Sequence, residues 1–284
     1  MIKKFEKTVL TDLETGVGAL AMNPFGAQLV NVQRMNSLTT DEDWVAEEIP
    51  VALVYNGISH AVMMTTPSQL EEFAVGFSLT EGIVPDMSHI YDIDIQPACQ
   101  GVSVNVEISS EAFWHLKEHR RSMTGRTGCG LCGVESLEGA IREKRRVPET
   151  QTFDMRHYPA ALHYLKDVEV LGQLTGCTHA AVWVKPDGTL AGGAEDVGRH
   201  VALDKLLGMR AMNGWTEGAL LVSSRASYEM VQKAAVCGVE IMFAVSAPTA
   251  LAVRLAKESG VTLAAFCRGQ NANVYAHPER LLGL

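Results

Sequence analysis

Two cysteines in a glycine-rich stretch are the residues of this chain best suited to chemistry. Cys129 and Cys132 lie three positions apart within Gly128–Gly133, and Arg126 closely precedes them. A thiol is nucleophilic as its thiolate, and a nearby guanidinium lowers the pKa of a thiol by stabilising that anion. Because glycine is costly inside helices and strands, we expect a flexible loop that exposes both sulfur atoms. The pattern indicates thiols that attack, are attacked, or carry a group between partners.

Residue types alone leave other roles open for the two cysteines. A structural zinc site needs two further Cys or His ligands, and the nearest candidates are Cys177 and His179. A thioredoxin-like redox pair would follow an apolar strand, whereas basic residues and glycine precede Cys129. Two idle surface thiols would be an oxidation liability. Group transfer, metal binding and disulfide exchange therefore all remain as interpretations.

Charge is unevenly distributed along the chain. The net charge is −9, which argues against a general nucleic-acid binder. No Lys or Arg occurs from Met35 to Leu116, whereas residues 117–146 hold eight of them against four acids. Part of this basic belt fits the solvated face of a helix. The belt would also suit an anionic ligand or an acidic partner.

The expected secondary structure divides the 284 residues into four parts. Asn56-Gly57 separates two β-type runs, which predicts a hairpin. Apolar residues at helical spacing over 70–79 predict a helix that ends near Gly82. The predicted parts are an N-terminal tail over 1–44, a small β-β-α-β-β domain over 45–110, linking helices around the mobile cysteine loop over 111–148, and an α/β domain with a largely parallel sheet over 149–284.

Two strand ends of the predicted α/β domain carry residues that could bind a ligand. In such sheets ligands gather at the carboxyl ends of strands. Ser223–Ser227 offers hydroxyls and a guanidinium, and Phe266–Asn271 offers one Arg, one Gly and two amides. Neither matches a nucleotide-binding fingerprint, so ordinary capping stays the simpler interpretation of each. Glu195–His200 is expected to open a helix, in a deaminase-like layout that lacks the metal ligands of deaminases.

Four motifs of the chain together give a specific resemblance to a known family. In chain order they are Gly128–Gly133, Thr175–Ala180, Glu195–His200 and Ser223–Met230. From about Val45 to its C-terminus the chain resembles the formate dehydrogenase accessory protein FdhD family. The resemblance implies a cytidine-deaminase-like, three-layer α/β/α second domain and a homodimer.

The resemblance also implies a function. It implies a sulfurtransferase that takes persulfide sulfur from a cysteine desulfurase and delivers it to the molybdenum bis(molybdopterin guanine dinucleotide) cofactor of formate dehydrogenase. Cys129 would carry the persulfide and Cys132 would assist or be dispensable. The segment that would help to bind the cofactor comprises Phe266, Cys267, Arg268, Gly269, Gln270 and Asn271.

Further expectations concern metals, location and rival functions. The resemblance implies no metal held by the protein itself, and a guanine nucleotide would mimic the cofactor. No run approaches the roughly 18 apolar residues of a membrane span, so we expect a cytoplasmic protein that binds neither membrane nor nucleic acid. The alternatives are a non-catalytic, cofactor-binding chaperone with structural or metal-binding cysteines, and a dithiol oxidoreductase.

Overall fold

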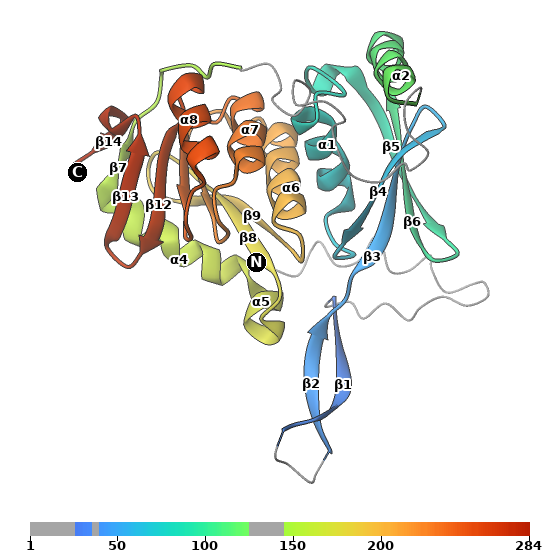
Figure 1. Cartoon of the computed structure of the whole chain (residues 1–284), viewed down its shortest axis with the longest axis horizontal. Coiled ribbons are helices and arrows are strands. Elements are labelled where there is room, and N and C mark those ends of the chain that lie inside the picture. Colours follow the sequence, from blue (N-terminus) through green and yellow to red (C-terminus); the bar gives the residue numbers. More distant parts are fainter. Residues whose placement is uncertain (1–25, 36–39, 125–144) are drawn as a thin grey trace.

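A computed structural model describes residues 26–35, 40–124 and 145–284, with the backbone alone for 119–124. The loop that carries Cys129 and Cys132, and most of the helix expected after it, lie outside the described residues. The described elements form two larger sheets with helices, a two-stranded antiparallel ribbon and a short two-stranded parallel sheet (Figure 1).

The smaller sheet has the strand order β4-β3-β6-β5. Asn56 and Gly57 take positive φ angles of 44° and 81°, as a two-residue hairpin turn requires, so the hairpin lies where it was predicted. One face of this sheet packs on α1 and α2 through a single apolar cluster. The elements are β3 (Ile49–Tyr55), β4 (Ile58–Thr65), α1 (Leu70–Thr80), β5 (Ile90–Ala98), β6 (Gly101–Ile108) and α2 (Ser110–Thr124), with the short 3₁₀ helix η1 (Met87–His89) before β5.

The region predicted to be an N-terminal tail contains two strands where the structure describes it. β1 (Ala27–Gln33) and β2 (Thr40–Ala46) pair as an antiparallel ribbon that projects from the rest of the molecule (Figure 1). The sequence of β2, Thr-Asp-Glu-Asp-Trp-Val-Ala, does not predict a strand, because acidic residues are rare in strands.

The larger sheet has the order β13-β12-β11-β10-β8-β9. β10, β11 and β12 run parallel, whereas β8, β9 and β13 join as antiparallel partners. The prediction of a largely parallel sheet therefore holds only for its centre. The strands are β8 (His179–Val184), β9 (Leu190–Asp196), β10 (Ala219–Val222), β11 (Ile241–Ala244), β12 (Thr262–Arg268) and β13 (Asn271–Ala276).

Helices cover both faces of this larger sheet (Figure 1). α6 (Arg199–Met212), α7 (Tyr228–Val236) and α8 (Ala250–Ser259) pack on one face around Trp183 and Leu220. The opposite face packs on Phe153 and on α4, and the short α5 follows α4. The remaining elements are β7 (Phe153–Asp154), η2 (Met155–His157), α4 (Tyr158–Val168), α5 (Val170–Thr175), η3 (Pro278–Arg280) and β14 (Leu281–Leu282).

Two local predictions differ from the structure in the larger unit. Glu195 and Asp196 end β9 instead of opening a helix, and α6 begins only at Arg199 after the cap residue Gly198. A strand that was not predicted, β13, follows Phe266–Asn271, so this segment is the end of β12 and a turn rather than a loop leaving the sheet. Both differences come from strand pairing, because β8 and β12 provide the partners.

The two sheets are joined where α1 crosses α6 with almost no side chain between them. A Cβ atom added to Gly76 of α1 would lie 1.7 Å from the backbone oxygen of Asp204, and one added to Gly208 of α6 would lie 1.9 Å from that of Glu72. Neither site tolerates even a methyl group without moving a helix.

We predict that Gly76→Ala lowers the free energy of unfolding by about 2 kcal/mol or more, because overpacking outweighs the gain in helix propensity. Gly198→Ala is the matched control, since its added Cβ meets nothing closer than 3.4 Å. Urea unfolding followed by circular dichroism measures both. Equal stability of Gly76→Ala and wild type would contradict the close crossing.

Candidate functional site

Four loops meet at the edge of the larger sheet where β10, β11 and β12 end. Ser223 N donates to Ala180 O at 2.9 Å, Ser246 N donates to Ser224 O at 3.3 Å, and Phe266 N donates to Ser246 O at 3.2 Å. These backbone bonds tie segments that are far apart in sequence into one surface. We call residues 176–180, 223–227, 245–249 and 266–271 the strand-end ledge. Both predicted binding segments, Ser223–Ser227 and Phe266–Asn271, belong to it.

Glu195 organises one end of the ledge. Its carboxylate accepts hydrogen bonds from Leu171 N at 3.0 Å, Gly172 N at 2.6 Å and Thr178 Oγ1 at 2.6 Å. The acid expected to begin its own helix therefore caps α5 and fixes the chain around the exposed Cys177. The sequence contained no signal for this contact, since Glu195 and the α5 backbone are separated by more than twenty residues.

Glu169 is a second acid of this region that sequence analysis missed. Ser223 Oγ donates to Glu169 Oε1 at 3.1 Å and accepts from Ala180 N at 2.9 Å. Burial raises the pKa of Glu169, the Ser223 bond opposes that change, and the nearby Glu195 adds to it. Glu169 thus holds a proton more readily than an exposed glutamate does.

Burial and the charge of Arg199 keep two histidines near the start of α6 from being protonated. Burial lowers the pKa of His179, and the positive charge of Arg199 lowers it further. Burial and Arg199 also lower the pKa of His200, although Glu229 of α7 opposes them, with His200 Nε2 2.8 Å from Glu229 Oε2. The His200–Glu229 contact joins the first turns of α6 and α7.

Several buried polar atoms near these two helix starts have no protein partner in the described parts of the chain. Arg199 Nε on α6 and Ser227 Oγ at the cap of α7 are two of them, and Tyr228 Oη and Gln232 Nε2 follow on α7. Such atoms are costly to leave unpaired. A bound polar ligand or water would satisfy them.

Phe266–Asn271 is held in an unusual conformation. Phe266 has φ of 55°, strained for a non-glycine residue, and the residue is 40% exposed. The β12–β13 pairing is irregular between Ala265 and Arg268, and Gly269 allows the turn that follows with φ of 59°. An aromatic face is therefore presented next to the Arg268 charge.

Tyr158 of α4 anchors the end of this segment at Asn271. Tyr158 Oη donates to Asn271 O at 2.9 Å. Cys267 is buried, and burial raises the pKa of its thiol to about 11, so Cys267 offers the ledge its backbone and no reactive sulfur. Among the predicted cofactor-binding residues, the exposed side chains are those of Phe266, Arg268, Gln270 and Asn271.

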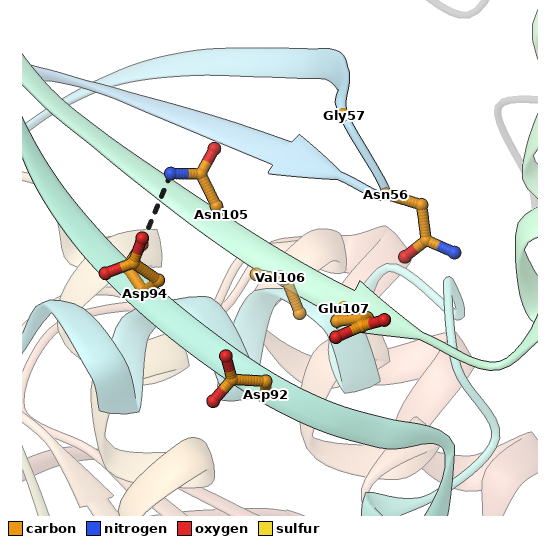
Figure 2. Close-up of a pocket in the computed structure, with 7 residues that line it drawn as sticks. All are labelled: Asn56, Gly57, Asp92, Asp94, Asn105, Val106 and Glu107. Atoms are coloured by element: carbon orange, nitrogen blue, oxygen red, sulfur yellow. Dashed lines mark hydrogen bonds between the residues drawn. The ribbon is translucent and has the colours of Figure 1, made fainter.

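A separate hollow lies on the outer face of the smaller sheet (Figure 2). It is lined by Asn56, Gly57, Asp92, Asp94, Asn105, Val106 and Glu107. Its three carboxylates would repel an anionic ligand, whereas the ledge carries Arg225 and Arg268, and Arg199 at the start of α6 acts on His179 of the ledge. The ledge is therefore the better candidate for an anionic group.

Comparisons with known proteins agree with the order of the motifs. The family model described as FdhD/NarQ matches residues 46–282. The solved structure of a candidate formate dehydrogenase accessory protein from Desulfotalea psychrophila is similar, with a TM-score of 0.71 at 26% sequence identity. The match covers 90% of this chain and 98% of that one. No helix within the described ranges is long and apolar enough to cross a membrane.

We predict that His179 titrates below the ordinary histidine value of 6.5 and that Arg199→Met raises its pKa without fully restoring that value. Burial, the larger cause, remains when the guanidinium is removed. Because the folded-state pKa is depressed, His179 favours folding above pH 6.5, and this contribution is lost as the pH falls below that value. NMR titration of the imidazole protons measures the pKa, and an unchanged value in Arg199→Met would refute the coupling.

Proposed function

Because this chain belongs to the FdhD/NarQ family, we propose that it matures formate dehydrogenase as a sulfur carrier. The Cys129 thiolate attacks the outer sulfur of a cysteine desulfurase persulfide, a new S–S bond forms, and the desulfurase thiolate leaves. The chain then delivers this sulfur to the molybdenum bis(molybdopterin guanine dinucleotide) cofactor, with Cys132 in an assisting role. The observation that carries the proposal is the family match, which includes the Cys129 motif.

The ledge and the adjoining start of α6 supply a second line of support, because their residues fit a guanine dinucleotide. Guanidinium groups bind phosphate with charge-assisted hydrogen bonds, and helix N-termini favour anions. The unpaired Arg199 Nε and Ser227 Oγ provide such donors at the starts of α6 and α7. The exposed Phe266 ring is suited to stack on a base.

A second candidate function uses the same ledge without sulfur transfer. A cofactor-binding chaperone would need the phosphate donors and the Phe266 ring, and its cysteines would be structural. The two functions differ in whether Cys129 becomes covalently modified. Sulfur loading and nucleotide binding are therefore measured separately.

Sulfur loading is tested by intact-protein mass spectrometry after incubation with a cysteine desulfurase and cysteine. We expect wild type to gain one sulfur, about 32 Da, that reductant removes. Cys129→Ala should lose this gain and should fail to activate formate dehydrogenase, while Cys132→Ala is the matched control. Full activation by Cys129→Ala would refute the carrier role and favour the chaperone.

Nucleotide binding is tested by calorimetry with GDP as the probe. We expect Arg268→Ala to weaken binding roughly ten-fold, the effect of one lost charge-assisted hydrogen bond. Arg254→Ala removes an equal charge from the exposed middle of α8 and should bind GDP as wild type does. Phe266→Ala should also weaken binding, and Phe266→Tyr should retain it. If all four variants bound GDP with equal affinity, the ledge would not be the nucleotide-binding site.

A further inference from the structure

A cavity lies where α1, α6 and α7 end. Its wall is formed by residues near those three helix ends and by residues 145–148, where the chain enters the larger unit. The cavity has a volume of about 510 Å³, and small-molecule sites span roughly 300–1,000 Å³. Arg210, on this wall, lies about 16 Å along the α6 axis from Arg199, at 1.5 Å per residue. The cavity is therefore separate from the strand-end ledge.

Arg210 is a partly buried cation without an acidic partner in the described ranges. Its Nη1 donates to Cys237 O at 2.7 Å, and its Nη2 donates to Thr216 O at 3.3 Å. Its Nε is buried and has no hydrogen-bond partner within the same ranges. Burial lowers the pKa of Arg210, and no described carboxylate opposes this change, only the sulfur of Cys237. A guanidinium has five N–H groups, so these contacts leave both charge and donors uncompensated.

The contacts that hold Arg210 in place do not neutralise it. Its Cζ lies 4.5 Å from the ring centroid of Trp183, a cation–π contact. The carbonyl groups of Thr216 and Cys237 follow the C-termini of α6 and α7, which carry only partial negative charge. Taking a cation out of water is costly unless an opposite charge pairs with it. An anion in the cavity would supply that charge.

Arg145 brings a second guanidinium to the same wall. Its Nη1 donates to Val236 O at 3.2 Å. Burial raises the pKa of the Cys237 thiol to about 12, and the charges of Arg210 and Arg145 both oppose this rise. Both guanidinium groups therefore lie close to Cys237, at one end of the cavity.

The acids around the cavity are already engaged with other groups. Asp86 is the one acidic residue among the described residues that line the wall. Its Oδ1 accepts from Ser88 N at 2.9 Å and lies 3.2 Å from His89 Nδ1. Outside the wall, Glu149 lies 3.6 Å from Arg146, so the charge of Arg146 has a partner. The charges of Arg145 and Arg210 remain available to a ligand.

The rest of the wall is largely apolar. Leu79 at the end of α1, Trp215 after α6 and Val236 at the end of α7 line it, and all three are only partly buried. A ligand that covered them would remove further apolar surface from water. The wall thus combines two unpaired cations with an apolar surface.

We propose that this cavity binds a small organic anion, in which a carboxylate or phosphate group is attached to an apolar body. Guanidinium groups bind either oxyanion through charge-assisted hydrogen bonds, so Arg145 and Arg210 would hold the anionic group. The apolar body would lie against Leu79 and Trp215. Such a ligand would contact both units at once and would stabilise their docking. The site is independent of sulfur transfer and of nucleotide binding at the ledge.

Calorimetry on the full chain with 2-naphthoate, 2-naphthyl phosphate and 2-naphthamide tests the proposal. At least one anion should bind roughly ten-fold or more tightly than the amide, which has the same rings but no charge. The tighter anion identifies the preferred group. Arg145→Ala should weaken its binding by about ten-fold. Arg254→Ala, the matched control, removes an exposed arginine from α8 and should bind as wild type does. Equal affinity for the anions and the amide would overturn the proposal.

A variant that fills the cavity tests the location. Ala211 lines the wall from the last turn of α6, so Ala211→Trp should abolish binding of the tighter anion. Ala160→Trp places the same ring on the exposed face of α4 and should bind as wild type does. Circular dichroism checks that each variant is folded, and the exposed Arg145 can be removed without disturbing the core. Wild-type affinity in both Ala211→Trp and Arg145→Ala would place the probe elsewhere, leaving Arg145 and Arg210 a structural role only.

Discussion

The close crossing of α1 and α6 is the contact on which the arrangement of both sheets depends. Gly76 and Gly208 bring two helix backbones together, and two buried lysines fix their relative position. Lys205 Nζ lies 2.7 Å from Asp196 Oδ2 and donates to Thr66 Oγ1 at 2.7 Å, and both charged side chains are fully buried. Lys233 Nζ contacts Asp204 Oδ2 at 2.9 Å and Glu81 Oε1 at 2.7 Å. Removing one partner of such a pair would leave a buried charge uncompensated, so the pairs specify one docking of the two parts.

α6 connects its crossing with α1 to the strand-end ledge. Its middle residues bind the smaller unit, while its first residues, Arg199 and His200, belong to the candidate site. Asp196 serves both regions, because one oxygen accepts from Gly198 N at the entry to α6 and the other accepts from Thr66 N. The position of the ledge is therefore coupled to the docking of the smaller sheet. The proposed transfer of sulfur to a large bound cofactor would require a fixed surface of this kind.

The ends of the chain segment that contains Cys129 are attached to different sheets. The segment follows α2, whose Phe113 and Leu116 pack in the cluster of the smaller sheet. It is followed by Val147, whose N–H donates to Ser259 O at 2.8 Å beside α8. Nearby, Glu240 accepts from Thr150 N at 2.8 Å, which secures the return of the chain to the larger sheet. The rigid docking of the two sheets therefore sets the distance that the cysteine segment spans.

The sequence by itself determined the elements with strong local signals and the family. Asn56-Gly57 specified a hairpin because its positive φ angles suit those residues, and apolar spacing specified α1 because burial follows the helical period. Tertiary structure alone decided that β1 and β2 form a ribbon, that β13 completes the sheet, and that Glu195 caps α5 instead of its own helix. It also brought Glu169 and Ser223 together and left Phe266 exposed in a strained conformation. These features depend on pairings between distant residues, whose free energy comes from partners that no local pattern identifies.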